Sequence, residues 1–155
     1  MSKLINQGCR VADIHHRYDE IHGALFGISV FRLLADKLRG KQGPGYGGLS
    51  LSLKGLGEEL VAVEAEIKAP PEENAPVTGA DRELQQALLE YAAYLSKAMT
   101  GLENICRNLE QDEAAYRSLR ADGRSRFSAD KLDYDHILSE LERQGTKLDR
   151  LFSTY

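Results

Sequence analysis

The residues best suited to chemistry in this sequence are three side chains near the N-terminus, His15, Asp19 and His22. Their spacing of four and three residues places them one turn apart along one edge of a helix. Imidazole and carboxylate groups are ligands of transition metals, and helical bundles hold metals with His and carboxylate side chains that point inward. One hypothesis is therefore a mononuclear metal site on this edge.

A structural interpretation of these histidines competes with the metal site. A dinuclear carboxylate site needs a Glu and a Glu-x-x-His arrangement on partner helices. His136, in the last part of the chain, is predicted to point away from the apolar side of its own helix, so the second half of such a site is missing. We therefore favour solvated histidines at a helix boundary, and we expect no cofactor.

A second group of candidate residues is basic and surrounds a predicted turn near residue 122. Guanidinium and ammonium groups there could hold an anion or an acidic partner. Asp122 and Asp130 oppose these charges, and the segment lacks the repeated aromatic residues on which nucleic-acid bases stack. A solvated charged turn is the favoured interpretation. The basic residues are Arg117, Arg120, Arg124, Arg126 and Lys131.

The overall charge argues against nucleic acid and membranes as partners. The 155 residues include 20 Lys and Arg and 24 Asp and Glu, which gives a net charge of −4. Nucleic acid and anionic lipid attract basic proteins. The N-terminal segment lacks the apolar core of a signal peptide, and no run approaches the roughly 20 apolar residues that span a bilayer. We expect a cytoplasmic protein in which Cys9 and Cys106 are thiols.

The five residues LSLKG, Leu51 to Gly55, resemble the H-x-L-K-G motif of histidine phosphotransfer domains. Those domains are four-helix bundles of comparable length. The position that matches the phosphorylated histidine is Leu51, which has no nitrogen to accept a phosphoryl group. Phosphotransfer therefore does not follow from this resemblance.

A long helix is predicted from about Asp81 to Ala121, because apolar residues recur there at alternating spacings of four and three. Asp112 interrupts the series, so we expect the helix to fray or bend beyond it. Thr78 and Asp81 supply acceptors at its start, and Gly123 is a stop after its end. The series is Leu84, Leu88, Tyr91, Leu95, Ala98, Leu102, Ile105, Leu109, Asp112, Tyr116 and Leu119.

Three further helices are predicted, over about Ala12 to Arg39, Leu49 to Lys68, and from about Ala129 onward with Ser128 as the cap. The segment 40–48 is a glycine-rich connector without the G-x-x-x-x-G-K-[ST] order of a phosphate-binding loop. The segment 69–79 is stiffened by prolines. Residues 1–155 are thus predicted to form one all-α domain, an antiparallel four-helix bundle with heptad-patterned, coiled-coil-like helices.

The first helix is predicted to change character along its length. His16 and Glu20 face water in its early turns, whereas beyond His22 the helix is apolar on every side and must be buried on two sides. The two interpretations are the hidden centre of a monomer and a homodimer interface. The candidate interaction surface comprises Gly23, Phe26, Gly27, Val30, Phe31 and Leu34.

No motif establishes an activity, so the function expected from the sequence depends on surfaces. The leading hypothesis is a protein-interaction adaptor, scaffold or regulatory subunit that binds a protein partner or a second copy of itself, with the first helix and the long helix as contact elements. The alternative is a metal- or small-ligand-binding helical enzyme that uses His15, Asp19 and His22. A third hypothesis is anion or nucleic-acid binding by the basic turn.

Overall fold

Four α-helices account for most of the described chain, which in this computed structural model comprises residues 2–26, 45–71 and 76–154. They are α1 (Ser2–Phe26), α3 (Tyr46–Lys68), α4 (Gly79–Arg117) and α5 (Arg126–Phe152). Those ranges contain no β-strand. The predicted all-α, four-helix architecture is confirmed.

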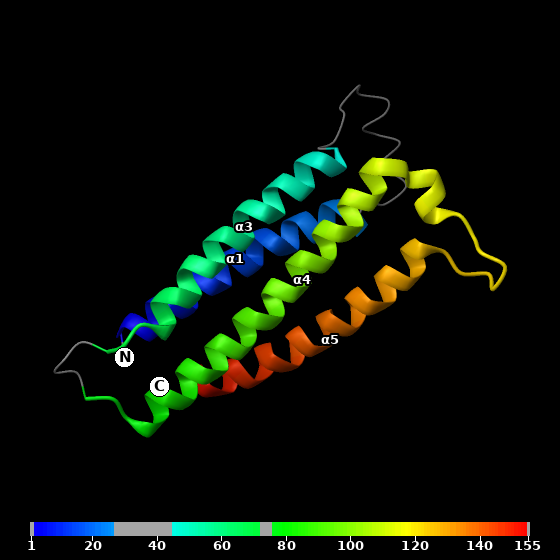
Figure 1. Cartoon of the computed structure of the whole chain (residues 1–155). Helices are drawn as coiled ribbons and strands as arrows, with labels where there is room; N and C mark the ends of the chain where they lie inside the picture. The colour runs from blue at the N-terminus through cyan, green and yellow to red at the C-terminus, as the bar shows by residue number, and fades with distance from the viewer. Residues whose placement is uncertain (1, 27–44, 72–75, 155) are drawn as a thin grey trace.

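The helices lie side by side, and each runs in the opposite direction to the one before it (Figure 1). The start of α3 lies beside the far end of α4, where the Tyr46 hydroxyl donates a hydrogen bond of 3.0 Å to Glu113. The far end of α5 lies beside the early part of α4, where Lys147 Nζ is 2.8 Å from Glu90. Among the described helices, α4 is the one that packs against all of the other three.

The predicted apolar series of α4 lies at the centre of the core. Leu88, Leu95 and Leu102 are each 0 % exposed, whereas Asp112 and Leu119 face solvent. Removing a Leu side chain from water contributes about 1.5–3 kcal/mol to folding, so this stripe is a principal stabilising element. The corresponding stripe of α3 is also buried and consists of Leu49, Leu53, Leu56, Leu60, Val63 and Ile67.

The first helix begins ten residues earlier than predicted, at Ser2 instead of Ala12. Its early turns have a buried face of their own, because Val11 joins the core and Leu4 packs against it. Arg10 also pairs with Glu66 of α3 at 2.5 Å. The predicted end of this helix, at Arg39, lies outside the described residues.

The cap of α5 is Ser125, not Ser128, so the helix begins at Arg126. The Ser125 hydroxyl accepts a hydrogen bond of 3.0 Å from the Ser128 backbone N–H, and the Ser128 hydroxyl accepts one of 2.9 Å from the Ser125 N–H. The two serines therefore satisfy each other's backbone donors, and the first of the pair starts the helix.

The long helix α4 begins with the predicted Thr78 and Asp81 acceptors, which form a reciprocal capping box. It is kinked at Asp112, where φ is −160° and ψ is 88°, as the polar interruption predicted. The Asp112 carboxylate accepts a hydrogen bond of 3.0 Å from Ala115 N–H and so caps the short turn beyond the kink. The helix ends at Arg117, and Gly123 lies in the following turn with φ of 75°.

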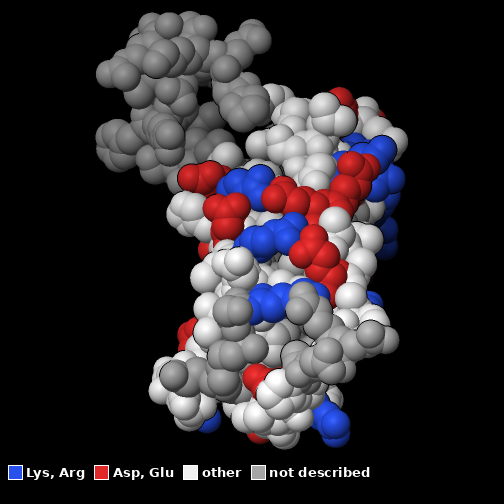
Figure 2. Space-filling model, turned by 90° about the vertical axis from the view of Figure 1, so that its left-hand side faces the viewer, with Lys and Arg blue, Asp and Glu red and all other residues white. Residues whose placement is uncertain are grey.

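The surface carries charges of both signs. On the face drawn in Figure 2, Lys and Arg alternate with Asp and Glu, so that face does not present a large field of one sign. No helix within the described ranges has the length and apolar character needed to cross a membrane.

Candidate functional site

The backbones of α1 and α5 do not pack against each other. Throughout the described residues their Cα atoms stay more than 8 Å apart, whereas α1 packs directly on α3 and on α4. Packed helix axes are usually only 8–10 Å apart, which brings backbones closer than this. Any contact between α1 and α5 is therefore made by side chains.

Aromatic side chains close one half of the space between α1 and α5. Tyr18 of α1 and Tyr134 of α5 share a hydrogen bond between their hydroxyl groups. His22 Nδ1 lies 2.7 Å from the Tyr134 hydroxyl, and the two rings are stacked with centroids 5.7 Å apart. Phe26 packs against both rings.

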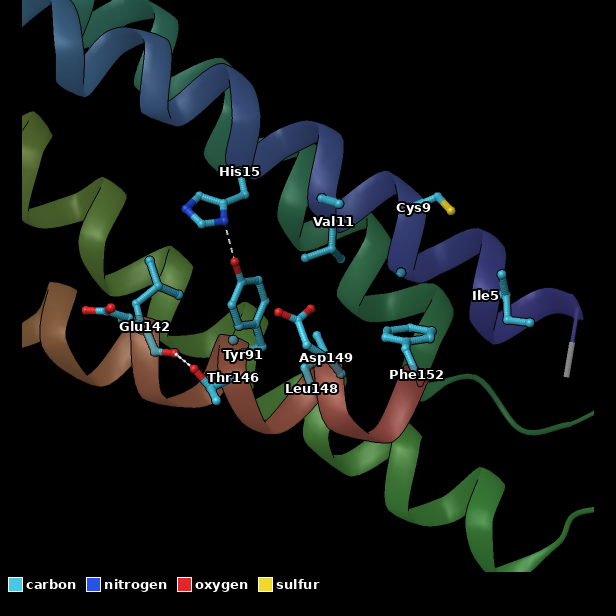
Figure 3. A pocket seen from close by; sticks show the side chains of 14 residues that line it. Ile5, Cys9, Val11, His15, Tyr91, Glu142, Thr146, Leu148, Asp149 and Phe152 are labelled. Carbon is cyan, nitrogen blue, oxygen red and sulfur yellow. Dashed lines mark hydrogen bonds between the residues drawn. The ribbon is translucent and has the colours of Figure 1, made fainter. Parts of the chain in front are cut away.

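The other half of the space is an open groove with a cavity volume of about 650 Å³ (Figure 3). Its floor is apolar, and its edges are formed by exposed residues such as Ala12 and Thr146. Asp149 points its carboxylate toward α1, and Tyr91 of α4 projects between the two helices. The groove is lined by Ile5, Gly8, Cys9, Val11, Ala12, His15, Tyr91, Leu141, Glu142, Gly145, Thr146, Leu148, Asp149 and Phe152.

Two glycines leave room for aromatic side chains at the boundaries of this groove. A Cβ atom on Gly8 would lie only 2.6 Å from the Phe152 ring, so the ring rests directly on the backbone of α1. A Cβ atom on Gly145 would lie 3.4 Å from the Tyr91 ring, an ordinary contact distance. Gly8 is thus the position where a side chain would displace the ring at the end of the groove.

A hydrogen-bonded series of polar groups borders the groove at its other end. The Tyr91 hydroxyl is hydrogen-bonded to His15 Nδ1, and His15 Nε2 lies 3.4 Å from the Asp19 carboxylate. Burial raises the pKa of Tyr91 far above its ordinary value, and the negative charges of Asp19 and Asp149 raise it further. The phenol therefore stays protonated and can donate a hydrogen bond to Nδ1.

The structure keeps His15 beside Asp19 but pairs His15 and His22 with different tyrosines. His15 is hydrogen-bonded to Tyr91, and His22 to Tyr134. Both imidazoles are half-buried, so they lie at the boundary of the core but have partners on their own chain. Within the described ranges, no three His, Cys, Asp or Glu side chains form a group that could hold a metal ion. The metal hypothesis stays a prediction that the metal content of the protein can test.

Three of the five basic residues near the α4–α5 turn contact neighbours on the protein's own helices. Arg117 Nε is 3.1 Å from Glu113, and Lys131 Nζ is 2.5 Å from Asp135. Arg126 donates a hydrogen bond of 3.2 Å to Asn108. Arg120 and Arg124 lie exposed in the turn itself. Binding of an anion by this group stays a prediction.

The candidate interaction surface on the first helix is only partly described. Gly23 is exposed, and among the described residues nothing beyond its chain neighbours and its own helix backbone lies within 4 Å of the position of a Cβ. Phe26 packs on its own chain, and Lys131 Nζ lies 4.7 Å from the centre of its ring. Gly27, Val30, Phe31 and Leu34 lie outside the described residues, so the homodimer stays a prediction.

Comparison with known proteins finds no matching family model, no similar curated protein and no similar solved structure.

Leu51, at the position of the phosphorylated histidine in the phosphotransfer motif, is 73 % exposed.

Sequence reasoning missed the groove, although one signal for it was present. Gly145 occupies a position in the apolar series of α5 where neighbouring members are large, such as Leu141 and Leu148. A glycine in such a series lets a neighbouring side chain approach the helix, and here the Tyr91 ring does so beside the groove. Tyr91 was assigned to the core by its spacing, and its hydroxyl partner on α1 could not be identified from that spacing.

Proposed function

We propose that this chain is a protein-interaction adaptor whose docking surface is the groove between α1 and α5. The observation that supports the proposal is the separation of these two helices, which leaves an open groove whose lining includes the exposed residues Ile5, Ala12 and Thr146. Apolar grooves with polar residues at their edges are typical of binding sites on proteins.

The shape of the groove favours part of another protein over a small molecule. Sites for small ligands usually bury 70–90 % of the ligand surface in a concave pocket. Here the lining extends from Ile5 to His15 on one helix and from Leu141 to Phe152 on the other, which is about 15 Å at 1.5 Å per residue. An elongated, open site of this kind suits a segment of polypeptide.

A second candidate function is small-ligand binding at the His15 end of the groove. The supporting observation is the series Asp19, His15 and Tyr91, in which a carboxylate lies beside an imidazole and the imidazole contacts a phenol. Such groups can orient a ligand by hydrogen bonds or exchange protons with it. This candidate predicts that ligand binding is lost in a His15→Ala variant whose groove is otherwise unchanged.

The proposed adaptor function can be tested by site-specific photo-crosslinking in an extract of the cells that produce the protein. A benzophenone side chain is placed at Thr146 in the groove or at Ala62, an exposed position on α3. We expect a discrete protein adduct from position 146 and none from position 62. The adduct should disappear when Ala12→Trp fills the groove and persist with Ala62→Trp in the same protein. Equal adducts from both positions, or an adduct that Ala12→Trp leaves intact, would contradict the proposal.

A further inference from the structure

We infer that the groove between α1 and α5 accepts an amphipathic α-helix of a partner protein that carries Lys or Arg beside its apolar face. This inference rests on the proposed function and specifies the chemistry of the partner. It depends on the length of the groove, on its apolar floor and on two carboxylates at its edge.

The length and floor of the groove fit nearly three turns of helix. A length of about 15 Å corresponds to about ten helical residues. The apolar surface within reach of a partner comes from the exposed Ile5 and Ala12 and the half-buried Phe152, which lie beside the buried Val11, Leu141 and Leu148. Helices that bind in grooves contribute apolar residues at positions i, i+3 or i+4, and i+7, which a site of this length can receive.

The charge at the edge of the groove selects a basic partner. Glu142 and Asp149 are exposed, line the groove and are seven residues apart, so they lie two turns apart along one side of α5 (Figure 3). Within the described residues neither carboxylate has an ion-pair partner, and no residue that lines the groove is Lys or Arg.

This arrangement gives the partner a specific pattern. Two cations seven residues apart on a bound helix would match the spacing of Glu142 and Asp149. Each would pair with a carboxylate that has no ion-pair partner among the described residues. Acidic residues at the same positions of the partner would instead be repelled. Charge should therefore select among amphipathic helices, while the apolar floor binds the face they have in common.

The test uses two synthetic helical peptides with the same leucines at i, i+4 and i+7. One carries two lysines seven residues apart beside the leucines, and the other carries glutamates in their place. Binding of each labelled peptide to the full chain is measured by fluorescence anisotropy. We expect the lysine peptide to bind at least about tenfold more tightly, and the preference to shrink as salt is added.

Matched variants distinguish the contribution of the two carboxylates to peptide binding from that of the groove. Glu142→Gln with Asp149→Asn should weaken the lysine peptide about fivefold to tenfold, since exposed pairs contribute modestly. Asp133→Asn with Glu140→Gln removes two carboxylates with the same spacing on the same helix, outside the groove, and should leave binding unchanged. Ala12→Trp should abolish binding of both peptides. Circular dichroism of each variant verifies that the helices are retained.

Equal binding of the two peptides, or no effect of the Glu142 and Asp149 changes, would overturn the inference. If peptide binding were abolished by Ala12→Trp in either of these cases, the groove would remain the docking surface and the proposed function would stand. Failure of both peptides to bind would overturn the inference, whereas the crosslinking at Thr146 would decide the proposed function separately. A dimer by light scattering that Ala12→Trp converts to a monomer would identify a second copy as the occupant and would likewise overturn the inference.

Discussion

The hydroxyl groups of Tyr18 and Tyr134 are hydrogen-bonded to each other between α1 and α5, and each side chain is only 1 % exposed. Burial raises the pKa of Tyr18 to about 12 and that of Tyr134 higher still, so both keep their protons. With neutral His22 as the final acceptor, Tyr18 can donate to Tyr134 and Tyr134 to His22 Nδ1. Polar bonds thus connect two helices whose backbones do not touch.

Removal of the central hydroxyl should destabilise the protein. Tyr134→Phe leaves both Tyr18 and His22 without their partner, and we expect the free energy of unfolding to fall by about 1–3 kcal/mol. Urea unfolding followed by circular dichroism measures this change. The Tyr18→Phe, Tyr134→Phe double variant should lose less than the sum of the two single variants, because it removes donor and acceptor together. Additive losses would show that the two hydroxyls do not interact.

Stability should depend on the protonation of His22. Burial lowers the pKa of His22, and the positive charge of Lys131 lowers it further, while Asp19 and Asp135 act in the opposite direction. The unfolded chain therefore takes up a proton at a higher pH than the folded protein does. We expect the free energy of unfolding to decrease as the pH falls below about 6.5, the ordinary pKa of histidine, until the folded form is protonated too.

Urea unfolding at several values between about pH 5 and pH 7 measures this dependence. His22→Asn should flatten it, whereas His136→Asn, at an exposed position of α5, should leave the slope unchanged. An unchanged slope in the His22 variant would assign the dependence to other groups.

The buried stripe of α4 should dominate stability over exposed leucines. Leu95→Ala removes a side chain with no exposed surface and should cost about 2–5 kcal/mol, because the surrounding core cannot fully close around the cavity. Leu51→Ala, at a largely exposed position, should change the free energy of unfolding by less than about 0.5 kcal/mol. Chemical denaturation of the two variants compares them directly, and similar losses would contradict the assignment of the core.

The cap of α4 should contribute measurably to stability. The Thr78 hydroxyl accepts a hydrogen bond of 3.1 Å from Asp81 N–H, and the Asp81 carboxylate accepts one of 3.0 Å from Thr78 N–H. Thr78→Ala should cost about 1 kcal/mol, seen as a lower Tm. Thr100→Ala, an exposed threonine within α4 whose hydroxyl bonds only to the helix backbone, is the matched control and should have little effect.

Metal content tests the sequence-based hypothesis for His15, Asp19 and His22. Because the structure gives each imidazole a tyrosine partner, we expect elemental analysis of the purified protein to find substoichiometric metal. One equivalent of a transition metal that is absent from His15→Ala and from His22→Ala would contradict this expectation. A retained metal in both variants would place it elsewhere on the protein.

The periodicity of the sequence predicts well which side of a helix is buried. Leu88, Leu95 and Leu102 are buried as their spacing requires, and the interruption at Asp112 is a real kink. Helix starts were harder to predict, because reciprocal capping by Ser125 and Ser128 allows either serine to be mistaken for the first. Local spacing fixes the direction of a side chain but not the residue at which the helix begins.

The groove could not be predicted in the same way because it depends on the distance between two helices far apart in sequence. Spacing alone placed Tyr91 in the core but did not show that its hydroxyl reaches His15. It placed His15, Asp19 and His22 on one edge but did not show that the imidazoles bond to different helices. The partner that a polar side chain finds on another helix depends on how the helices pack, and the spacing of residues along one helix does not determine it.

The separation of α1 from α5 also has a consequence for local opening of the protein. Because α1 packs on α3 and α4 but not on α5 within the described residues, we expect its amide hydrogens to exchange with heavy water sooner than those of α4. A molecule seated between α1 and α5 would supply the missing support and slow that exchange. Deuterium uptake along α1 would then report whether the groove is occupied, without any label on the bound molecule.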